Sequence, residues 1–463
     1  MTSSLPFSSL PLSQAILNNL DTLGYQSMTP IQAQSLPGVL AGKDLIAQAK
    51  TGSGKTAAFG LGIVHKLDAS ARHIQAMVLC PTRELSEQVA QELRRLARAI
   101  PNIKTLTLCG GTPIRPQVES LKFGAHIIVG TPGRIMDHIE RDTVDFSGLH
   151  TLVLDEADRM LDMGFYDDVT KIVNACPGTR QTLLFSATYA DDIRKASARF
   201  LHQPEEIKVE SVHNASQIVQ HFYEIEDDKR LATVAQLLEH FRPTSTLAFC
   251  NTKAQCRELA DYLESRGFSA LALHGDLEQR DREDVLIQFA NRSCSVLIAT
   301  DVAARGLDID SLDAVINVEL TPDPEVHIHR IGRTGRGQAR GLALSLCSAR
   351  EMRRANQIET YQGQAIIWAN PKNLRSAPGG LLRAPMVTLC IQGGKKDKLR
   401  AGDLLGALTK DAGLAGQQVG KINILEFVSF VALERSVARQ AYAKLSASNI
   451  KGRRFKMRFM AEV

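Results

Sequence analysis

The sequence lacks any long hydrophobic run, any close pair of cysteines and any short-period repeat. No apolar run approaches the roughly 18 residues that cross a bilayer, and residues 1–13 lack the basic and then apolar layout of a signal peptide. The eight cysteines are scattered, without a Cys-x-x-Cys pair, so their spacing suggests neither a zinc site nor a disulfide framework. We therefore expect a cytoplasmic protein whose cysteines are reduced and mostly buried.

The 463 residues do contain enough apolar material for ordinary cores, at 44% hydrophobic and 23% charged. A chain of this length predicts two or three domains, since a typical domain has about 100–200 residues. The net charge of +5 is unevenly distributed, because residues 380–463 contain 15 Lys and Arg against 6 Asp and Glu. This basic end suggests a polyanion-binding module, although on charge alone a solvated basic surface is an equal alternative.

Short apolar runs alternate with longer amphipathic stretches, a pattern typical of parallel α/β sheets. The pattern occurs twice, with a polar stretch near residues 210–220 between the two parts, so we expect two α/β domains, 1–209 and 210–369. The predicted strands are 76–80, 126–129, 151–154 and 182–185 in the first domain and 246–249, 270–273, 295–299 and 314–318 in the second; the predicted helices include 84–99 and 193–200.

A third region follows residues 370–385, whose three prolines and adjacent glycines indicate a linker. Residues 386–463 then read in the order strand, helix, strand, strand, helix, strand, which predicts a small α+β domain of the split βαβ type. The predicted elements are strand 386–391, helix 403–414, two strands within 421–433, helix 436–446 and strand 454–459.

The first chemical motif is the run Ala-Lys-Thr-Gly-Ser-Gly-Lys-Thr at residues 49–56. Glycine-rich backbone here can turn its amides toward phosphate oxygens, Lys55 can reach the β and γ phosphates, and the Thr56 hydroxyl can bind Mg²⁺. The motif predicts a P-loop, with Ala49 in place of the usual first glycine. A plain glycine-rich turn is the alternative that this motif alone leaves open.

A second motif, Asp-Glu-Ala-Asp at residues 155–158, follows the apolar run 152–154. At the end of a parallel strand, Asp155 can hold a magnesium ion and Glu156 can orient a water for attack on the γ-phosphorus. Alone, such a cluster is usually a solvated turn or a helix N-terminus. After a P-loop, it indicates a metal and water site.

A third motif lies in the second α/β domain, where residues 329–336 read His-Arg-Ile-Gly-Arg-Thr-Gly-Arg. Phosphoryl transfer needs positive charge at the γ-phosphate, and guanidinium groups supply it without losing their proton. Arg333 and Arg336 are our candidate arginine fingers. A solvated basic loop is the alternative for this segment in isolation.

Together these motifs resemble the DEAD-box ATP-dependent RNA helicases over about residues 5–360. The resemblance implies two RecA-like domains that bind ATP and RNA cooperatively. Their closure would bend one RNA strand and displace its partner strand. The resemblance also implies that Ser186-Ala187-Thr188 couples hydrolysis to strand separation and that Asp308 lies near the ribose.

The same resemblance assigns the reading of adenine to an N-terminal motif. Gln32 would hydrogen-bond the adenine edge, Tyr25 would stack on the ring, Phe7 would be the isolated upstream aromatic residue, and Thr29 belongs to the same motif. The remaining nucleotide-binding residues would be Thr51, Gly52, Ser53, Gly54, Lys55 and Thr56.

Contacts to RNA are implied at short motifs in both α/β domains. In the first domain they are Pro81, Thr82, Arg83, Gly110, Gly111, Thr131, Gly133 and Arg134; in the second they are Asn251, Thr252, Gly275, Gln279, Arg282 and Thr300. Two residues depart slightly from the family pattern, namely Ser86, where alanine is frequent, and His327, where tyrosine is frequent.

The last 80 or so residues resemble the RNA recognition motif of the DbpA subgroup, whose substrate class is large-subunit (23S) ribosomal RNA. On the middle strand we expect Phe427 at one ring position and Ser429 at the second, and Thr388 at the ring position of the first strand. Base stacking should therefore contribute less than usual, and binding should depend on basic residues. These are Lys395, Lys396, Lys398, Arg400, Lys451, Arg453 and Arg454; solvated lysines around a protein-binding fold are the alternative.

The sequence thus predicts an RNA-stimulated ATPase that uses ATP and Mg²⁺ to unwind structured RNA locally, with 23S ribosomal RNA or the pre-50S particle as partner during ribosome assembly. We expect neither a membrane nor DNA as partner. One alternative is a noncatalytic RNA-binding assembly factor, against which the intact Lys55, Glu156, Arg333 and Arg336 argue. The other is a DNA-directed translocase on the same core.

Overall fold

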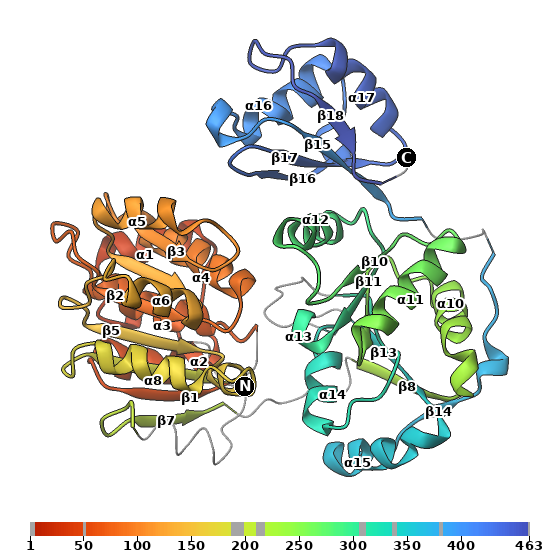
Figure 1. The fold of residues 1–463 in the computed structure, drawn as a ribbon, viewed down its shortest axis with the longest axis horizontal. Coiled ribbons are helices and arrows are strands. Elements are labelled where there is room, and N and C mark those ends of the chain that lie inside the picture. The colour runs from red at the N-terminus through yellow and green to blue at the C-terminus, as the bar shows by residue number, and fades with distance from the viewer. Residues whose placement is uncertain are drawn as a thin grey trace. The chain divides into compact units, whose positions relative to one another are not determined.

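A computed structural model describes residues 5–49, 52–186, 199–209, 218–304, 312–335, 340–378 and 383–461. The chain forms two compact units, and the described residues up to 209 belong to the first. The second unit contains a further α/β domain and the small C-terminal domain (Figure 1). None of the described helices is both long and apolar enough to span a membrane.

The described strands of the first unit form one parallel seven-stranded sheet in the order β3-β4-β2-β5-β6-β1-β7. Its central strands are near-continuous apolar runs because helices cover both faces of the sheet. The four strands predicted for this unit are confirmed. The strands are β1 (Leu45–Gln48), β2 (Ala76–Leu79), β3 (Thr105–Leu108), β4 (Ile127–Gly130), β5 (Thr151–Asp155), β6 (Gln181–Ser186) and β7 (Glu205–Lys208).

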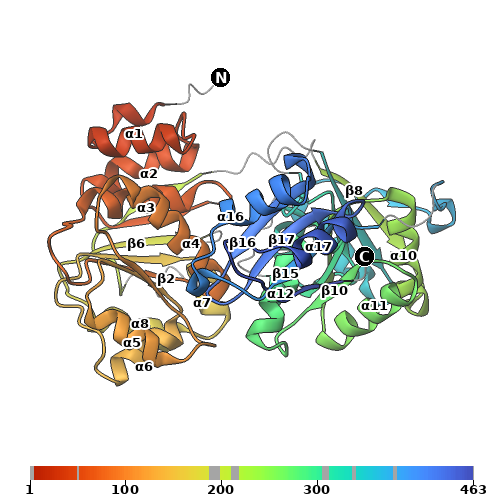
Figure 2. The ribbon, with the colours of Figure 1, turned by 90° about the horizontal axis from the view of Figure 1, so that it is seen from above.

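Two helical layers enclose this sheet, as Figure 2 shows. One buried cluster joins Phe59 and Leu93 to one face, and a second joins Ile135 and Ile172 to the other. The helices are α1 (Gln14–Thr22), α2 (Pro30–Leu40), α3 (Lys55–Lys66), α4 (Arg83–Leu96), α5 (Ile114–Lys122), α6 (Pro132–Glu140), α7 (Ala157–Asp162) and α8 (Tyr166–Ala175). The predicted helix 193–200 falls almost wholly outside the described residues.

The α/β domain of the second unit repeats this plan, with a parallel sheet in the order β10-β11-β9-β12-β13-β8-β14. The predicted strands are again confirmed. The strands are β8 (Ile218–Glu224), β9 (Thr246–Cys250), β10 (Ala270–Leu273), β11 (Val296–Thr300), β12 (Ala314–Asn317), β13 (Gly341–Cys347) and β14 (Trp368–Ala369). The helices are α10 (Arg230–Phe241), α11 (Lys253–Ser265), α12 (Gln279–Ala290), α13 (Asp301–Ala304), α14 (Pro324–Ile331) and α15 (Met352–Gln362).

The C-terminal domain is an antiparallel four-stranded sheet in the order β16-β17-β15-β18, packed on one face against its helices. Alternate residues of β15, such as Val387 and Leu389, enter the core with Leu404 and Leu445. The elements are β15 (Met386–Ile391), α16 (Ala401–Gly406), β16 (Val419–Ile424), β17 (Ser429–Glu434), α17 (Ala438–Ala447) and β18 (Met457–Phe459). The predicted helix 403–414 is α-helical only to Gly406, because the chain widens into a π-helical turn over Ala407–Asp411.

The predicted ring positions of the middle strand were wrong. The strand β17 begins at Ser429, so Phe427 lies in the turn that precedes it, and a backbone hydrogen bond of 2.8 Å from Leu425 N to the Val428 carbonyl closes that turn. The Ser429 side chain is buried and donates to the Gly393 carbonyl at 2.6 Å. Side chains alternate between the two faces of a sheet along each strand. Ser429 therefore points to the face opposite to the one expected for a base-stacking position.

The first part of the predicted linker is bound to the second α/β domain. The Arg375 amide donates to His240 Nδ1 at 3.1 Å, and the Ala377 amide donates to the Glu239 carbonyl at 3.3 Å. Both acceptors lie near the C-terminal end of α10. Residues 370–378 therefore lie along a helix end, while 379–382 are outside the described residues.

Candidate nucleotide and RNA sites

Apart from the N-terminal motif, the predicted site residues of the first unit lie at one edge of its sheet, where the parallel strands end. The predicted nucleotide motifs follow β1, β5 and β6, which are neighbours in the sheet, and three predicted RNA motifs follow β2, β3 and β4, which are also neighbours. This is the edge at which open α/β sheets hold their ligands. The fold thus places the predicted nucleotide motifs and the predicted RNA motifs on neighbouring strands of one edge.

The P-loop connects β1 to α3. Gly54 caps the helix with φ of 91°, a left-handed conformation that suits glycine, and Lys55 is the first helical residue. Lys55 is only 6% exposed, and its Nζ has no hydrogen-bond partner within the described part of the chain. A buried ammonium group needs an anionic partner, so the site fits the phosphates of a nucleotide. Gly52 and Ser53 lie in the turn before α3 and Thr56 lies in the first turn of that helix, while Thr51 is outside the described residues.

The paired carboxylates follow β5. Asp155 is 3% exposed, and burial raises the pKa of its carboxyl to about 7, with Lys55 opposing this rise and Glu156 adding to it. Glu156 has a left-handed φ of 51°, and its carboxylate lies 3.4 Å from Arg159 Nε. A buried carboxylate of this kind needs a cation or hydrogen-bond donors to compensate its charge.

The N-terminal motif touches the P-loop directly. Gln32 is buried, accepts a hydrogen bond from the Thr29 amide at 2.9 Å and donates one to the Gly54 carbonyl at 3.1 Å. Tyr25 donates to Glu92 at 2.6 Å and packs edge-on against Phe7, with the ring centroids 6.0 Å apart. The structure therefore places Gln32 at the phosphate-binding turn and joins the two aromatic residues in one packed pair.

The last residue of β6 is in contact with the acidic motif. The Asp158 amide donates to Ser186 Oγ at 3.4 Å. Ser186 begins the segment that the resemblance links to strand separation, whereas Ala187 and Thr188 lie outside the described residues.

The predicted RNA motifs of the first unit contact one another, because arginine side chains from α4 and α6 reach the turn after β3. Arg83, at the start of α4, lies so close to the glycines after β3 that a Cβ on Gly111 would be 2.0 Å from its Nη1. Thr82 caps α4 by accepting from the Leu85 amide at 3.2 Å. Arg134 donates to the Thr112 carbonyl at 3.0 Å. Pro81, Gly110 and Thr131 lie in the turns after β2, β3 and β4, and Gly133 lies in the first turn of α6.

The second α/β domain also brings its predicted RNA residues to one sheet edge. Asn251 and Thr252 follow β9, and Thr252 caps α11 by accepting from the Gln255 amide at 3.3 Å. Arg282 donates to the Ala303 carbonyl at 2.8 Å, which links α12 to the turn after β11. Gly275 follows β10, Gln279 begins α12 and Thr300 ends β11.

Sequence reasoning missed the part played by Arg330 in α14. Its buried guanidinium donates to both carboxylate oxygens of Asp301 at 2.7 Å, to Asn251 Oδ1 at 3.0 Å and to the Glu319 carbonyl at 2.9 Å. Arg330 is thus a positioning residue for the turns after β9 and β11. Two features of the sequence could have indicated this role. Arg330 belongs to a basic motif, and Asp301 lies just after a predicted strand. Arg333 is buried, while Arg336 and Asp308 lie outside the described residues.

The predicted basic residues of the C-terminal domain are all exposed and come from two adjacent turns. Lys451 Nζ donates to the Lys398 carbonyl at 2.8 Å, which joins the turn at 395–400 to the turn at 451–454. The structure therefore brings these seven cations to one end of the domain.

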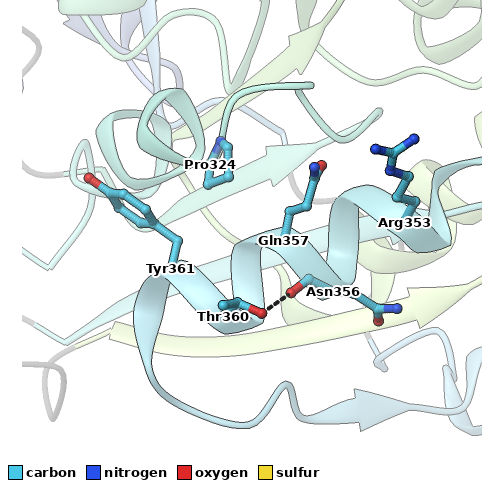
Figure 3. A pocket seen from close by; sticks show the side chains of 6 residues that line it. All are labelled: Pro324, Arg353, Asn356, Gln357, Thr360 and Tyr361. Carbon is cyan, nitrogen blue, oxygen red and sulfur yellow. Dashed lines mark hydrogen bonds between the residues drawn. The ribbon is translucent and has the colours of Figure 1, made fainter.

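A hollow of about 440 Å³ lies elsewhere, on α15 of the second α/β domain (Figure 3). Its lining consists of Pro324, Arg353, Asn356, Gln357, Thr360 and Tyr361. None of the predicted site residues is among them.

Three family models match the chain in the order of its domains. They are the DEAD/DEAH box helicase over residues 29–196, the helicase conserved C-terminal domain over 229–338 and the DbpA RNA binding domain over 388–459. The fold is similar to that of S. cerevisiae Dbp5 bound to RNA and ADP BeF3, with a TM-score of 0.73 and 29% identity, covering 80% of this chain and 96% of that one.

Curated relatives agree with these models. The DEAD-box ATP-dependent RNA helicase CshA of Geobacillus kaustophilus (strain HTA426) is 42% identical over 81% of either chain. The ATP-dependent RNA helicase DbpA of Escherichia coli (strain K12) is 52% identical over 97% of this chain and 98% of the relative. With its two RecA-like domains and its C-terminal RNA-binding domain, this chain therefore belongs to the DEAD-box ATP-dependent RNA helicases of the DbpA type.

Proposed function

We propose that this helicase unwinds large-subunit (23S) ribosomal RNA locally during ribosome assembly in the cytoplasm. The observation that carries the proposal is the exposed cluster of seven cations on a C-terminal domain of the DbpA type. Such a cluster can hold one structured RNA, whereas the motifs of the helicase domains suit phosphates and sugars, which carry no direct sequence information.

In ATP hydrolysis, each residue of the nucleotide motifs would have a separate role. Lys55 would bind the phosphates, and Thr56 with Asp155 would hold Mg²⁺, partly through water. Magnesium commonly uses one or two protein oxygens together with substrate phosphates and waters, and the Thr56 hydroxyl and the Asp155 carboxylate are oxygen ligands of this kind. Glu156 would orient the attacking water, and Arg333 and Arg336 would stabilise charge on the γ-phosphate.

Selection of ATP would rest on Gln32, with Tyr25 stacking on the base. A glutamine amide can pair with the donor and the acceptor of adenine, whereas guanine offers an acceptor at the corresponding position. The contact between Gln32 and Gly54 supports this assignment, since it ties the base-reading residue to the phosphate-binding turn.

The test is ATPase activity of the full-length chain with three nucleic acids of equal length: a fragment of 23S ribosomal RNA, an unrelated RNA and the DNA version of the 23S fragment. We expect the 23S fragment to stimulate turnover at the lowest concentration, the unrelated RNA only at higher concentration, and the DNA not at all. Equal stimulation by both RNAs would contradict the ribosomal assignment. Stimulation by DNA would favour the translocase instead.

A further inference from the structure

The face of the C-terminal sheet that usually stacks RNA bases is covered in this protein. Thr388, at a ring position of the first strand, accepts from Asn291 Nδ2 at 3.2 Å and lies 2.6 Å from the Ser293 hydroxyl. Both partners follow α12 in the helicase core. On this face, the middle residues of β15 and β17 are all at most 5% exposed, namely Thr388, Cys390, Phe430 and Ala432, while Met386 and Glu434 at the strand ends are partly exposed.

This burial removes Phe430, the aromatic residue of β17, as a stacking platform, because it is only 2% exposed. Stacking by an RNA recognition motif requires rings that a base can reach. The sheet face is therefore engaged with the second α/β domain, and RNA must bind elsewhere on the C-terminal domain.

An aromatic ring is exposed at the end of the domain that carries the cations. Phe427, at the tip of the turn between β16 and β17, is 70% exposed. The backbone amides of Lys395 and Lys396 donate to the carbonyls of Leu425 and Glu426, both at 2.9 Å. These two hydrogen bonds fix the tip that carries Phe427 against the first basic turn.

The cations around this tip are only partly neutralised. Lys396, Lys451 and Arg453 form ion pairs with Glu426, Asp403 and Asp397 at 3.3–3.7 Å. The other four cations of the two turns, Lys395, Lys398, Arg400 and Arg454, have no ion pair among the described residues. A large exposed ring in a positive field combines base stacking with phosphate attraction, as single-strand binding surfaces do.

We propose that Phe427 stacks on an unpaired base of a structured RNA while the basic turns on either side hold the neighbouring phosphates. This inference rests on the proposed RNA-binding function of the C-terminal domain. It places base recognition at the loop end of the domain and leaves the sheet face to the helicase core.

The test compares the full-length parent chain with Phe427→Ala and Phe427→Trp in equilibrium binding to a 23S ribosomal RNA fragment over a range of salt concentrations. Stacking on one base predicts that Phe427→Ala weakens binding about 5- to 150-fold, while Phe427→Trp restores it. The slope of log affinity against log salt should stay unchanged, because the ring neutralises no phosphate. Unaltered binding by Phe427→Ala would overturn the proposal, as would a loss accompanied by a flatter slope.

Two controls complete the design. Phe123→Ala removes another highly exposed phenylalanine, in the first unit, and should leave binding unchanged. A fully paired RNA duplex offers no unpaired base, so the parent and Phe427→Ala should bind it equally; an equal loss on the duplex would overturn stacking. If the parent does not distinguish the 23S fragment from an unrelated RNA with unpaired bases, the ribosomal assignment fails, whereas weaker binding of both RNAs by Phe427→Ala still supports the inference.

Discussion

At the scale of single residues, the candidate sites depend on charged side chains that are buried away from solvent. Lys55 and Asp155 are both buried beside the phosphate-binding turn, and Arg330 is buried in the second unit. Burial strengthens each interaction with a partner and raises the cost of losing that partner. Substitutions at such residues should therefore change either activity or stability, and measurements of ATPase turnover, ligand binding and unfolding distinguish these effects.

The first prediction concerns Glu156. The amide of Glu156→Gln retains the shape of the side chain but cannot act as the base that polarises water, so we expect ATP and RNA to bind normally while turnover falls about 10²-fold or more. Steady-state ATPase activity and equilibrium binding of the two ligands measure this. Glu119→Gln, an exposed change in α5, is the control. Near-normal turnover in Glu156→Gln would remove the residue from this role.

The second prediction concerns His327, which is fully buried and has no hydrogen-bond partner for either ring nitrogen among the described residues. Burial, aided by Arg330, lowers the pKa of its imidazole to about 3. The unfolded chain, with a pKa near 6.5, therefore binds more protons than the folded chain as the pH falls from 6.5 towards 3, and the free energy of unfolding decreases over that range.

The variant His327→Phe lacks this titration and keeps an aromatic ring against Phe222, whose centroid lies 5.7 Å from the imidazole. Its stability advantage over the parent should grow by about 2 kcal/mol between pH 7.5 and pH 5. Urea unfolding followed by the fluorescence of Trp368, the single tryptophan, reports on this domain because Trp368 lies in β14 and contacts Phe222. A difference in the free energy of unfolding that stays constant with pH would show that His327 titrates alike in the folded and unfolded chains, which would contradict the prediction.

At the scale of elements, the sequence predicted the two parallel sheets better than the C-terminal sheet. A strand such as β2 is buried on both faces and reads as an uninterrupted apolar run, so its position is visible without a partner. In the C-terminal domain, the register of β17 depends on the turn that carries Phe427, and a shift in that turn exchanges the two faces. The role of Arg330 was hidden for a related reason, since its partners come from turns far apart in the sequence.

The third prediction tests Arg330 as the link between α14 and the turns after β9 and β11. Arg330→Gln leaves Asp301 without its bidentate partner, so the free energy of unfolding of the second α/β domain should fall by about 3 kcal/mol. Urea unfolding followed by Trp368 fluorescence measures it. Arg350→Gln breaks a solvent-exposed pair with Asp227 and should change stability by less than about 0.5 kcal/mol. Equal effects of the two variants would contradict the role of Arg330.

At the scale of the whole molecule, the chain combines a general RNA-dependent motor with an added RNA-binding domain. The C-terminal sheet forms hydrogen bonds with the second α/β domain through Thr388, which contacts Asn291 and Ser293, and through the Met386 amide, which donates to the Arg292 carbonyl at 3.3 Å. Residues 370–378 lie along α10 and belong structurally to the helicase core. The core should therefore fold and hydrolyse ATP without the added domain.

The last prediction follows from this division. A chain that ends after Pro378 keeps the contacts of residues 370–378 with α10 and lacks the seven exposed cations and Phe427. With unrelated RNA at high concentration it should reach an ATPase rate close to that of the full chain, because the sheet-edge motifs remain. It should lose the preference for a 23S fragment over an unrelated RNA of equal length, since phosphate contacts carry no direct sequence information. The measurement is RNA-stimulated ATPase activity over a range of RNA concentrations for both chains and both RNAs. A truncated chain that retains the preference would place RNA specificity in the helicase core.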